Sequence, residues 1–266
     1  MIRHQSFYSR YEGLILGGGA VLIVVAVWEF AWSRFTFDPS HGWISPLFFS
    51  GPSAIAKQFW YLLTEGTLTS DILFSGKNFI LGLLLATVAG VVLGVIVGWY
   101  RRIRLVLDPF LNALYATPRI AMIPMIIIWF GIGVQAKVFI VFMSAFFPIL
   151  VNTAGGMRSL DPDLLRAARA FCASDWQIFK TIAIPGSVPF ILTGIRQGVA
   201  LGLIGVVIGE MFGGSEGVGY LVVYGGQTFQ MDTAFVGVIL VAFSGMLLTF
   251  VTERLERRFS RWRPER

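Results

Sequence analysis

The 266-residue sequence is 56% hydrophobic and only 14% charged, whereas an ordinary soluble domain carries roughly 25% charged residues. Its apolar residues form runs of about 20 residues, long enough to cross a hydrocarbon layer as helices. The net charge of +6 does not indicate a nucleic-acid ligand, because the basic residues gather at the ends of the apolar runs. The composition therefore excludes a soluble domain and predicts an all-α integral membrane protein.

Six apolar segments are expected to cross the membrane. They cover residues 13–33, 78–99, 109–131, 134–154, 187–211 and 234–252. The first follows Arg3 and Arg10, as a signal peptide would, but no small-residue cleavage site comes after it, which favours an uncleaved membrane helix. Because no internal repeat is present, residues 1–266 are predicted to form a single domain.

The third and fifth segments have distinctive residues. Pro118 and Pro124 interrupt the third, and a proline in a membrane helix frees a backbone carbonyl that needs a partner. The third segment is therefore expected inside the helix bundle, away from lipid. The fifth has a glycine at nearly every fourth position, which predicts close contact with another helix. These glycines are Gly194, Gly198, Gly202, Gly205 and Gly209.

The basic residues of the connections set the orientation. With the N-terminus inside, the inner segments hold fifteen Lys and Arg, whereas the outer ones hold Arg34, Lys57, Lys77 and Lys137. Cytoplasmic connections carry the excess of positive charge, so both termini are predicted to be cytoplasmic. The outer connection 34–77 contains a short amphipathic helix at Pro52–Leu63, and the outer connection 212–233 is rich in glycine.

The cytoplasmic connection 157–189 is expected to form two short helices. Asp161 before Pro162 is a helix start, Ser174 is a second N-cap, and Pro185 should end the second helix. Helices this short need a partner for their apolar faces. Two interpretations remain: the helices cover the cytoplasmic end of the bundle, or they insert into a groove of another subunit.

The segment RAARAFCASDWQIFKTIAIPGSVPFILTGIR (166–196) is similar to the EAA loop of permease subunits of bacterial ATP-binding-cassette (ABC) importers. It matches at Ala167 and Ala168, at the Ala173–Ser174 turn and at Ile184–Pro185. It departs at Arg166 and Cys172, where the family has glutamate and glycine. The resemblance implies a set of ATPase-coupling residues, and we expect Cys172→Gly to be tolerated. The set is Leu165, Arg166, Ala167, Ala168, Phe171, Cys172, Ala173, Ser174, Trp176 and Pro185.

The resemblance extends over about residues 45–263, through Asp108–Gly133, Gly209–Val222 and the Glu-Arg-rich ending. It is closest to the nitrate/sulfonate/taurine branch. It implies a type I importer permease in the bacterial inner membrane, paired as a homodimer. A cytoplasmic ATPase dimer would bind ATP and Mg²⁺, and an extracytoplasmic binding protein would deliver a small solute. This chain itself needs no cofactor in such a system.

Polar or helix-breaking residues inside the spans are the candidates for a translocation path. Arg119 lies between Pro118 and Pro124, where a broken helix would expose backbone groups to the solute. Arg119 and Arg196 could attract an anion, or they could bridge helices near the cytoplasmic surface. Glu210 ends the fifth span, where it could line or gate the path or act as an interfacial carboxylate.

Several kinds of active site are missing from the sequence. There is no GxxxxGK[ST] motif and no GxSxG motif, so ATP hydrolysis is expected in another subunit. His4 and His41 lie far from any pair of carboxylates, and Cys172 has no partner for a disulfide or a metal site. A secondary transporter or channel would need inverted repeats or a chain of acidic residues across the spans, and the sequence shows neither. A membrane enzyme would need a cluster of titratable residues near one face, and none is visible.

Overall fold

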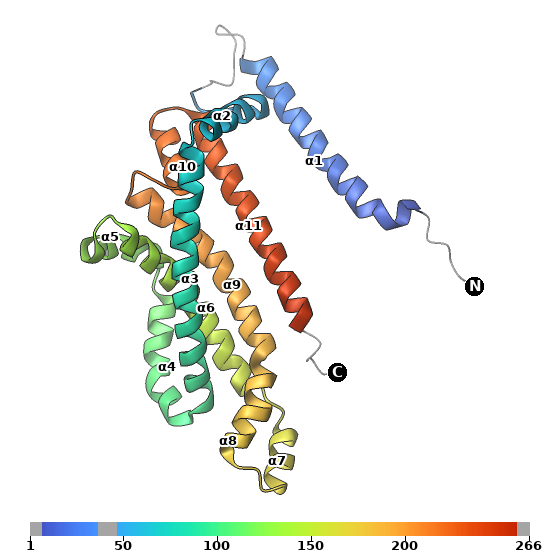
Figure 1. Ribbon diagram of the computed structural model, residues 1–266, viewed down its shortest axis with the longest axis vertical. Helices are drawn as coiled ribbons and strands as arrows, with labels where there is room; N and C mark the ends of the chain where they lie inside the picture. The colour runs from blue at the N-terminus through green and yellow to red at the C-terminus, as the bar shows by residue number, and fades with distance from the viewer. Residues whose placement is uncertain (1–6, 37–46, 260–266) are drawn as a thin grey trace. The chain divides into compact units, whose positions relative to one another are not determined.

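The computed structural model describes residues 7–36 and 47–259, with side chains for 16–34, 47–256 and 258. His4 and His41 lie outside these residues. The described residues form helices joined by short connections (Figure 1). The helices are α1 Phe7–Thr36, α2 Pro52–Thr64, α3 Thr67–Trp99, α4 Arg101–Ala116, α5 Arg119–Phe130, α6 Val134–Arg158, α7 Pro162–Ala170, α8 Asp175–Ile178, α9 Ile184–Phe212, α10 Val218–Gln227 and α11 Met231–Phe259, with a π-helical turn at Phe179–Ala183 before α9.

The chain divides into two compact units. The first combines Met1–Leu68 with Leu221–Val238, and its described part is held by contacts around the end of α1. Trp28 Nε1 donates a hydrogen bond to the Ser50 carbonyl at 2.9 Å, and Phe235 packs against the Trp28 ring. The amphipathic helix expected at Pro52–Leu63 is present as α2, in which Ile55 is buried.

The second unit combines Thr69–Tyr220 with Ile239–Arg266, and α6 is its most buried helix. Four glycines of α3 face α6 so closely that an added Cβ would overlap or crowd their partners. The pairs are Gly82 with Val141, Gly90 with Ile149, Gly94 with Thr153 and Gly98 with Met157. Residue numbers rise together in both helices, so α3 and α6 run parallel. Small residues permit this approach of two membrane helices.

The glycine face expected in the fifth span is confirmed on α9. Gly194, Gly198 and Gly205 are buried against residues of α6, and an added Cβ would lie 2.7–3.0 Å from Asn152, Ile149 or Ser144 respectively. The α9 numbers rise as the α6 numbers fall, so these two helices are antiparallel. The bundle of the second unit is therefore built on glycine contacts along both sides of α6.

Five described helices are long and apolar enough to span a membrane: α1, α3, α6, the run Asp175–Phe212 and α11. They match five of the six expected segments, although α3 begins at Thr67 instead of residue 78. Asp71, Ser75 and Lys77, expected in the outer connection, are therefore helical. Lys137 likewise lies in the first turn of α6 and is only 3% exposed. The polar residues Asp71 and Ser75 hid the start of α3, because hydrogen bonds to distant residues satisfy them.

The expected third span 109–131 is not one helix. It is the pair α4 and α5, bent by 95°. Thr117 has ψ 127°, because a residue before proline is pushed out of the helical region. Pro118 then precedes Arg119, the first residue of α5. Because α3 and α6 run parallel, the chain must return to the first side between them, and the α4–α5 pair is the segment that makes this return.

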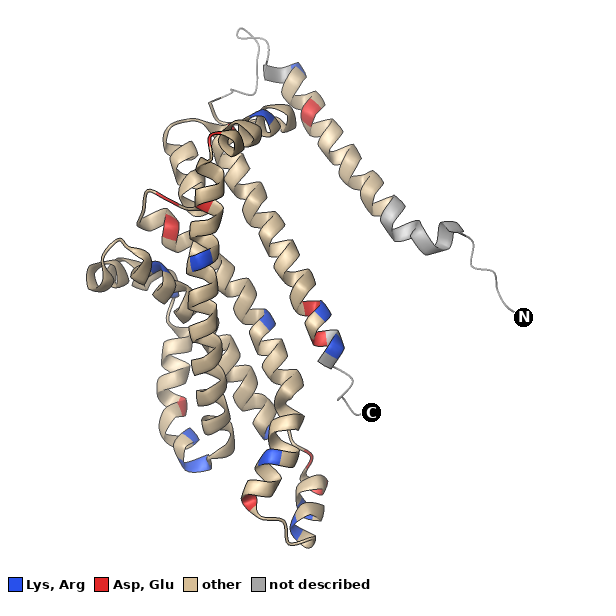
Figure 2. Ribbon diagram, viewed as in Figure 1, with Lys and Arg blue, Asp and Glu red and all other residues tan. Residues whose placement is uncertain are grey.

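The expectation that the third segment is enclosed in the bundle is wrong for the single chain. None of the residues of α4 is buried, and α5 buries only Ile123 and Ile126 against α6 and α9. The bend at Pro118 divides the segment into two short helices. The α4 helix contacts α6 only through residues that are not buried, such as Leu111 and Tyr115. Charged residues of the second unit are found at the start of α4 and on the short helices α7 and α8 (Figure 2).

Candidate functional site

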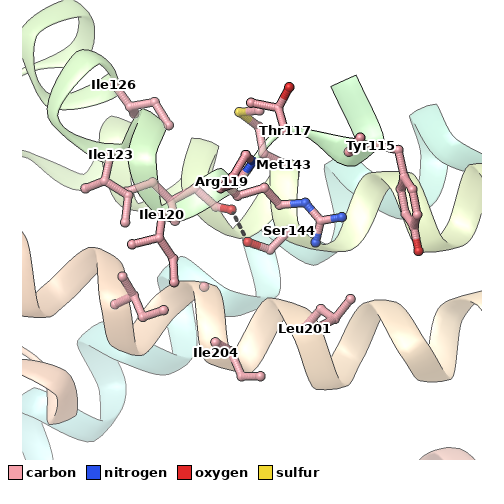
Figure 3. A pocket seen from close by; sticks show the side chains of 15 residues that line it. Tyr115, Thr117, Arg119, Ile120, Ile123, Ile126, Met143, Ser144, Leu201 and Ile204 are labelled. Carbon is pink, nitrogen blue, oxygen red and sulfur yellow. Dashed lines mark hydrogen bonds between the residues drawn. The ribbon is translucent and has the colours of Figure 1, made fainter. Parts of the chain in front are cut away.

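A cavity of about 360 Å³ lies between the bend, α6 and α9 in the second unit (Figure 3). We call it the Arg119 cavity. Its wall is mostly apolar, and it falls in the size range of sites that bind small molecules. It is lined by Tyr115, Ala116, Thr117, Pro118, Arg119, Ile120, Ile123, Ile126, Ile140, Met143, Ser144, Leu201, Ile204, Gly205 and Ile208.

Among the described residues that line this cavity, only Arg119 is charged. Its guanidinium lies over the rings of Tyr115 and Phe147, 5.6 and 5.8 Å from their centroids. Its Nε is buried, and no hydrogen-bond partner for it occurs among the described residues. Cation–π contacts favour a cation here, but they leave the N–H donor unsatisfied, and a buried unpaired donor is costly. The cavity is therefore complementary to an acceptor, above all an anionic one.

The nearby hydroxyl groups do not satisfy Arg119. Ser144 Oγ donates to the Ile140 carbonyl at 2.8 Å, the bond drawn in Figure 3. Thr117 Oγ1 donates to the Ala113 carbonyl at 2.9 Å. Each hydroxyl keeps acceptor capacity toward the cavity. Pro118 lies in the lining beside Arg119, whereas Pro124 lies within α5 and outside the lining.

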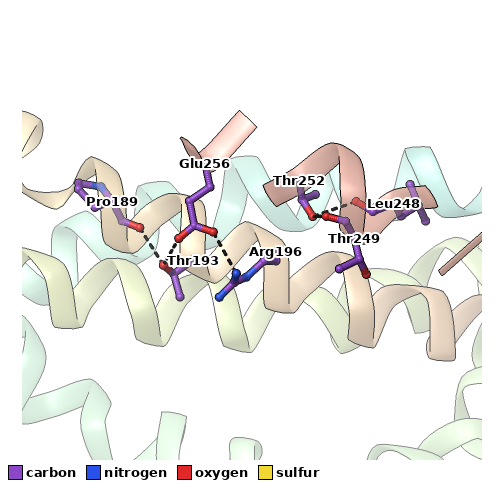
Figure 4. A network of polar contacts seen from close by, with 7 residues as sticks. All are labelled: Pro189, Thr193, Arg196, Leu248, Thr249, Thr252 and Glu256. Carbon is purple, nitrogen blue, oxygen red and sulfur yellow. Dashed lines mark hydrogen bonds and ion pairs between the residues drawn. The ribbon is translucent and has the colours of Figure 1, made fainter. Parts of the chain in front are cut away.

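Arg196 lies away from the Arg119 cavity. It bridges α9 and α11 through an ion pair with Glu256, with Nη1 and Oε2 3.2 Å apart (Figure 4). Thr193 Oγ1, one turn earlier, is 3.4 Å from the other oxygen of Glu256. Of the two interpretations left open for Arg196, the helix bridge is the one that matches this geometry.

Glu210 is fully buried at the other end of α9. Its Oε2 accepts hydrogen bonds from Ser75 Oγ and from the Gly219 N–H, both at 2.9 Å. Asp71, 7% exposed, accepts from the Gly217 N–H at 2.7 Å. Sequence reasoning missed Asp71 and Ser75, which stood within an assumed loop. An acidic residue and a serine four positions apart, one helical turn, were the available signal.

The cytoplasmic connection has the two expected N-caps. Asp161 accepts from the Asp163 N–H at 2.8 Å, and Ser174 forms a capping box with Gln177. The expectation that Pro185 ends the second helix is wrong. The π-helical turn, in which the Ile184 N–H bonds the Phe179 carbonyl, carries α8 directly into α9. The wider turn accommodates a proline that lacks an N–H.

The expected coupling residues differ in solvent exposure. Phe171 is 88% exposed and Trp176 68%, whereas Leu165, Ala168 and Ala173 are half-buried. Trp176 stacks on Phe179, with ring centroids 5.5 Å apart. Arg166, at the position of the family glutamate, pairs with Asp163. Ala167, Cys172 and Ser174 are exposed, and Pro185 is half-buried.

Cys172 has φ 58°, the left-handed conformation that glycine adopts most easily. It follows α7 in a Schellman motif, in which the Cys172 N–H bonds the Arg169 carbonyl and the Ala173 N–H bonds the Ala168 carbonyl. A glycine at this position would adopt the left-handed conformation without strain, whereas the cysteine of this chain adopts it with strain.

Cys172→Gly is therefore expected to stabilise the connection by up to about 1 kcal/mol, because the left-handed conformation costs a non-glycine residue roughly 1–2 kcal/mol and the entropy of glycine offsets part of the gain. Cys172→Val should destabilise it, since β-branching worsens the strain. Amide hydrogen exchange over residues 168–173 would be slower in the glycine variant and faster in the valine variant. Equal exchange rates in the two variants would contradict the strained left-handed conformation of Cys172.

Comparison with known proteins identifies the family. Residues 86–262 match the family described as "binding-protein-dependent transport system inner membrane component". A putative aliphatic sulfonates transport permease of Bacillus subtilis is 31% identical, over 96% of this chain and 89% of that protein. The taurine transport system permease of Escherichia coli is 29% identical, over 97% and 92%. A riboflavin transport system permease of Chloroflexus aurantiacus is 31% identical, over 96% and 92%.

Solved structures support the same fold. A chain of an inward-facing MetNI methionine ABC transporter superposes with a TM-score of 0.64 at 18% sequence identity, covering 73% of this chain and 96% of that one. The fold of this chain therefore resembles that of type I importer permeases. The chain is a multi-pass inner-membrane permease of an ABC importer and belongs to the family of binding-protein-dependent transport system inner membrane components.

Proposed function

We propose that this permease carries a small anion across the membrane through the Arg119 cavity. The observation that carries the proposal is the Arg119 guanidinium, which lines an apolar cavity without a carboxylate partner among the described residues and with a buried, unsatisfied Nε. An oxyanion would accept from that N–H and neutralise the charge, giving the strong class of hydrogen bond. Relatives named for aliphatic sulfonates and taurine support a sulfonate as the solute, and nitrate has the same charge.

Family membership implies an ATPase and a substrate-binding protein as partners. In our proposal two copies of this chain form the membrane pore, and ATP and Mg²⁺ bind to the ATPase dimer. The exposed rings of Phe171 and Trp176 support a docking role for the cytoplasmic connection, since large apolar groups in water are stabilised by burial in a partner. Closure of the ATPase on ATP would then switch the permease between its inward-facing and outward-facing conformations.

The proposal predicts that Arg119→Gln reduces anion uptake roughly 10- to 100-fold, the loss expected when a hydrogen bond to a charged group is removed. Arg119→Lys should retain part of the uptake, because it keeps the charge but loses the planar donors. Arg196→Gln is the matched control, since Arg196 pairs with Glu256 away from the cavity. The measurement is uptake of labelled taurine, ethanesulfonate and nitrate into proteoliposomes that hold the complete transporter.

Two results would count against this function. Full uptake by Arg119→Gln would remove Arg119 from the path. Uptake only of solutes that lack a sulfonate or another oxyanion group would show that the cavity does not select an anionic group. Riboflavin belongs in the panel, because one relative carries that name and because riboflavin has no sulfonate.

A further inference from the structure

The segment Gly213–Gly219, which we call the outer loop, lies beyond the Arg119 cavity along the same helices. That cavity reaches Ile208 on α9 and Ile126 on α5. A second cavity of about 540 Å³ is lined by Phe212–Glu216 and by Ile132–Val134, about one helical turn further on, and includes Phe74 and Lys137. The charge distribution places this end of α9 outside the cytoplasm. A solute from outside would therefore pass the outer loop before it reaches Arg119.

Three successive backbone N–H groups of the outer loop and its α10 junction are bound by three different side chains of the membrane helices. Gly217 donates to Asp71, Val218 donates to Ser75 at 2.9 Å, and Gly219 donates to Glu210. The Ser75 hydroxyl, which accepts from the Val218 N–H, also donates to Glu210. The groups at the start of α10, which have no partner within that helix, are thus satisfied by α3 and α9.

The fit around these bonds is tight. Gly217 has φ 112°, and a Cβ there would overlap the Glu210 carboxylate. A Cβ at Gly214 would lie 2.5 Å from Lys137 Nζ. Lys137 is buried, lies 4.6 Å from the centre of the Phe74 ring, and interacts electrostatically with Glu210 and Glu216. Buried charges in a membrane protein are expensive and are kept where they have a function.

We propose that Asp71, Ser75 and Glu210 form a latch that holds the outer loop closed over the extracytoplasmic end of the translocation path. Release of these three N–H groups opens the path to solute from outside, and their recapture closes it. The three residues position the loop and need not touch the solute. This inference rests on the proposed function, because it takes the Arg119 cavity to be part of the path.

The test measures access to the Arg119 cavity from outside. Ser144 lines that cavity, so Ser144→Cys is introduced with Cys172→Ser, which removes the one native cysteine. The complete transporter, in proteoliposomes oriented with this face outward, is treated with a membrane-impermeant thiol reagent without ATP. Ser75→Ala and Glu210→Gln should each raise the labelling rate about tenfold or more, since each weakens hydrogen bonds of the closed state.

Thr193→Ala is the matched control, because Thr193 is also an α9 hydroxyl 3.4 Å from a glutamate oxygen, but at the cytoplasmic end (Figure 4). It should leave the labelling rate unchanged. Thermal unfolding and retention of the ATPase establish that each variant is assembled. If Ser75→Ala does not assemble, Glu210→Gln decides the result, because glutamine keeps the size of the side chain and an acceptor oxygen.

Two negative outcomes are distinguishable. If Ser144→Cys is labelled when the transporter is trapped with ATP and vanadate, but neither latch variant raises labelling at rest, the latch is overturned and the proposed function stands. If the cysteine is never labelled from outside, even in the trapped state, the Arg119 cavity is not on the path and both proposals fail.

Discussion

Phe171→Ala should weaken the association of the permease with its ATPase about 30-fold or more, the effect of removing an interface residue that contributes at least 2 kcal/mol. Phe171 is 88% exposed at the end of α7. Its removal therefore costs the fold of the isolated permease little, and the loss appears in the complex. Binding of the purified ATPase to the permease in nanodiscs gives the dissociation constant, and thermal unfolding of the permease alone gives the stability.

Ile128→Ala is the control for this prediction. Ile128 is a large apolar residue that is 80% exposed, but it lies in α5 and outside the cytoplasmic connection. It should leave ATPase binding unchanged. Trp176→Ala is expected to lower both binding and stability, because Trp176 stacks on Phe179, which in turn contacts Trp99 of α3. Normal ATPase binding by Phe171→Ala would mean that the connection only covers the end of the bundle.

Gly94→Ala should destabilise the permease by about 1–3 kcal/mol, the range for overpacking a close-packed interior. A Cβ at Gly94 would lie 2.6 Å from Thr153 Cβ and 2.8 Å from the Leu150 carbonyl oxygen. The second contact is with backbone, so no change of side-chain rotamer relieves it, and α3 must move away from α6. The midpoint of thermal unfolding in detergent and the yield of folded protein should both fall.

Gly76→Ala in the same helix gives the matched comparison. An added Cβ at Gly76 meets nothing within 4 Å, and alanine is favoured over glycine in a helix by about 1 kcal/mol. This variant should be neutral or stabilised. Equal destabilisation by the two substitutions would show that helix propensity, and not the contact with α6, controls the effect of glycine in α3.

Sequence patterns predicted the parts of this protein that depend on neighbouring residues. Apolar length predicted five helices that span the membrane, and the glycine spacing predicted the contact face of α9. Asp161 and Ser174 predicted their N-caps, because capping bonds form within three residues of the cap. The resemblance of residues 166–196 predicted the family, which the match over residues 86–262 confirms.

Local patterns failed where distant residues decide the conformation. The start of α3 was missed because Asp71 and Ser75 are polar, and only partners on other elements, including Gly217, explain their burial. The effect of proline also depended on context: Pro118 divides the third span into α4 and α5, whereas Pro185 is carried within a continuous helix by a π-helical turn.

The sequence by itself determined the helical membrane class, the caps of the connection 157–189 and the family, because each depends on composition or on contacts along the chain. The orientation that its basic residues indicate stays a prediction. Only the tertiary structure decided which charged residues share a site. It brought Arg119 to a cavity with residues of α6 and α9, paired Arg196 with Glu256, joined Glu210 to Ser75, and bonded Asp71 to Gly217. Helices that are distant along the chain meet through glycine faces, and their packing determines which polar groups lie together.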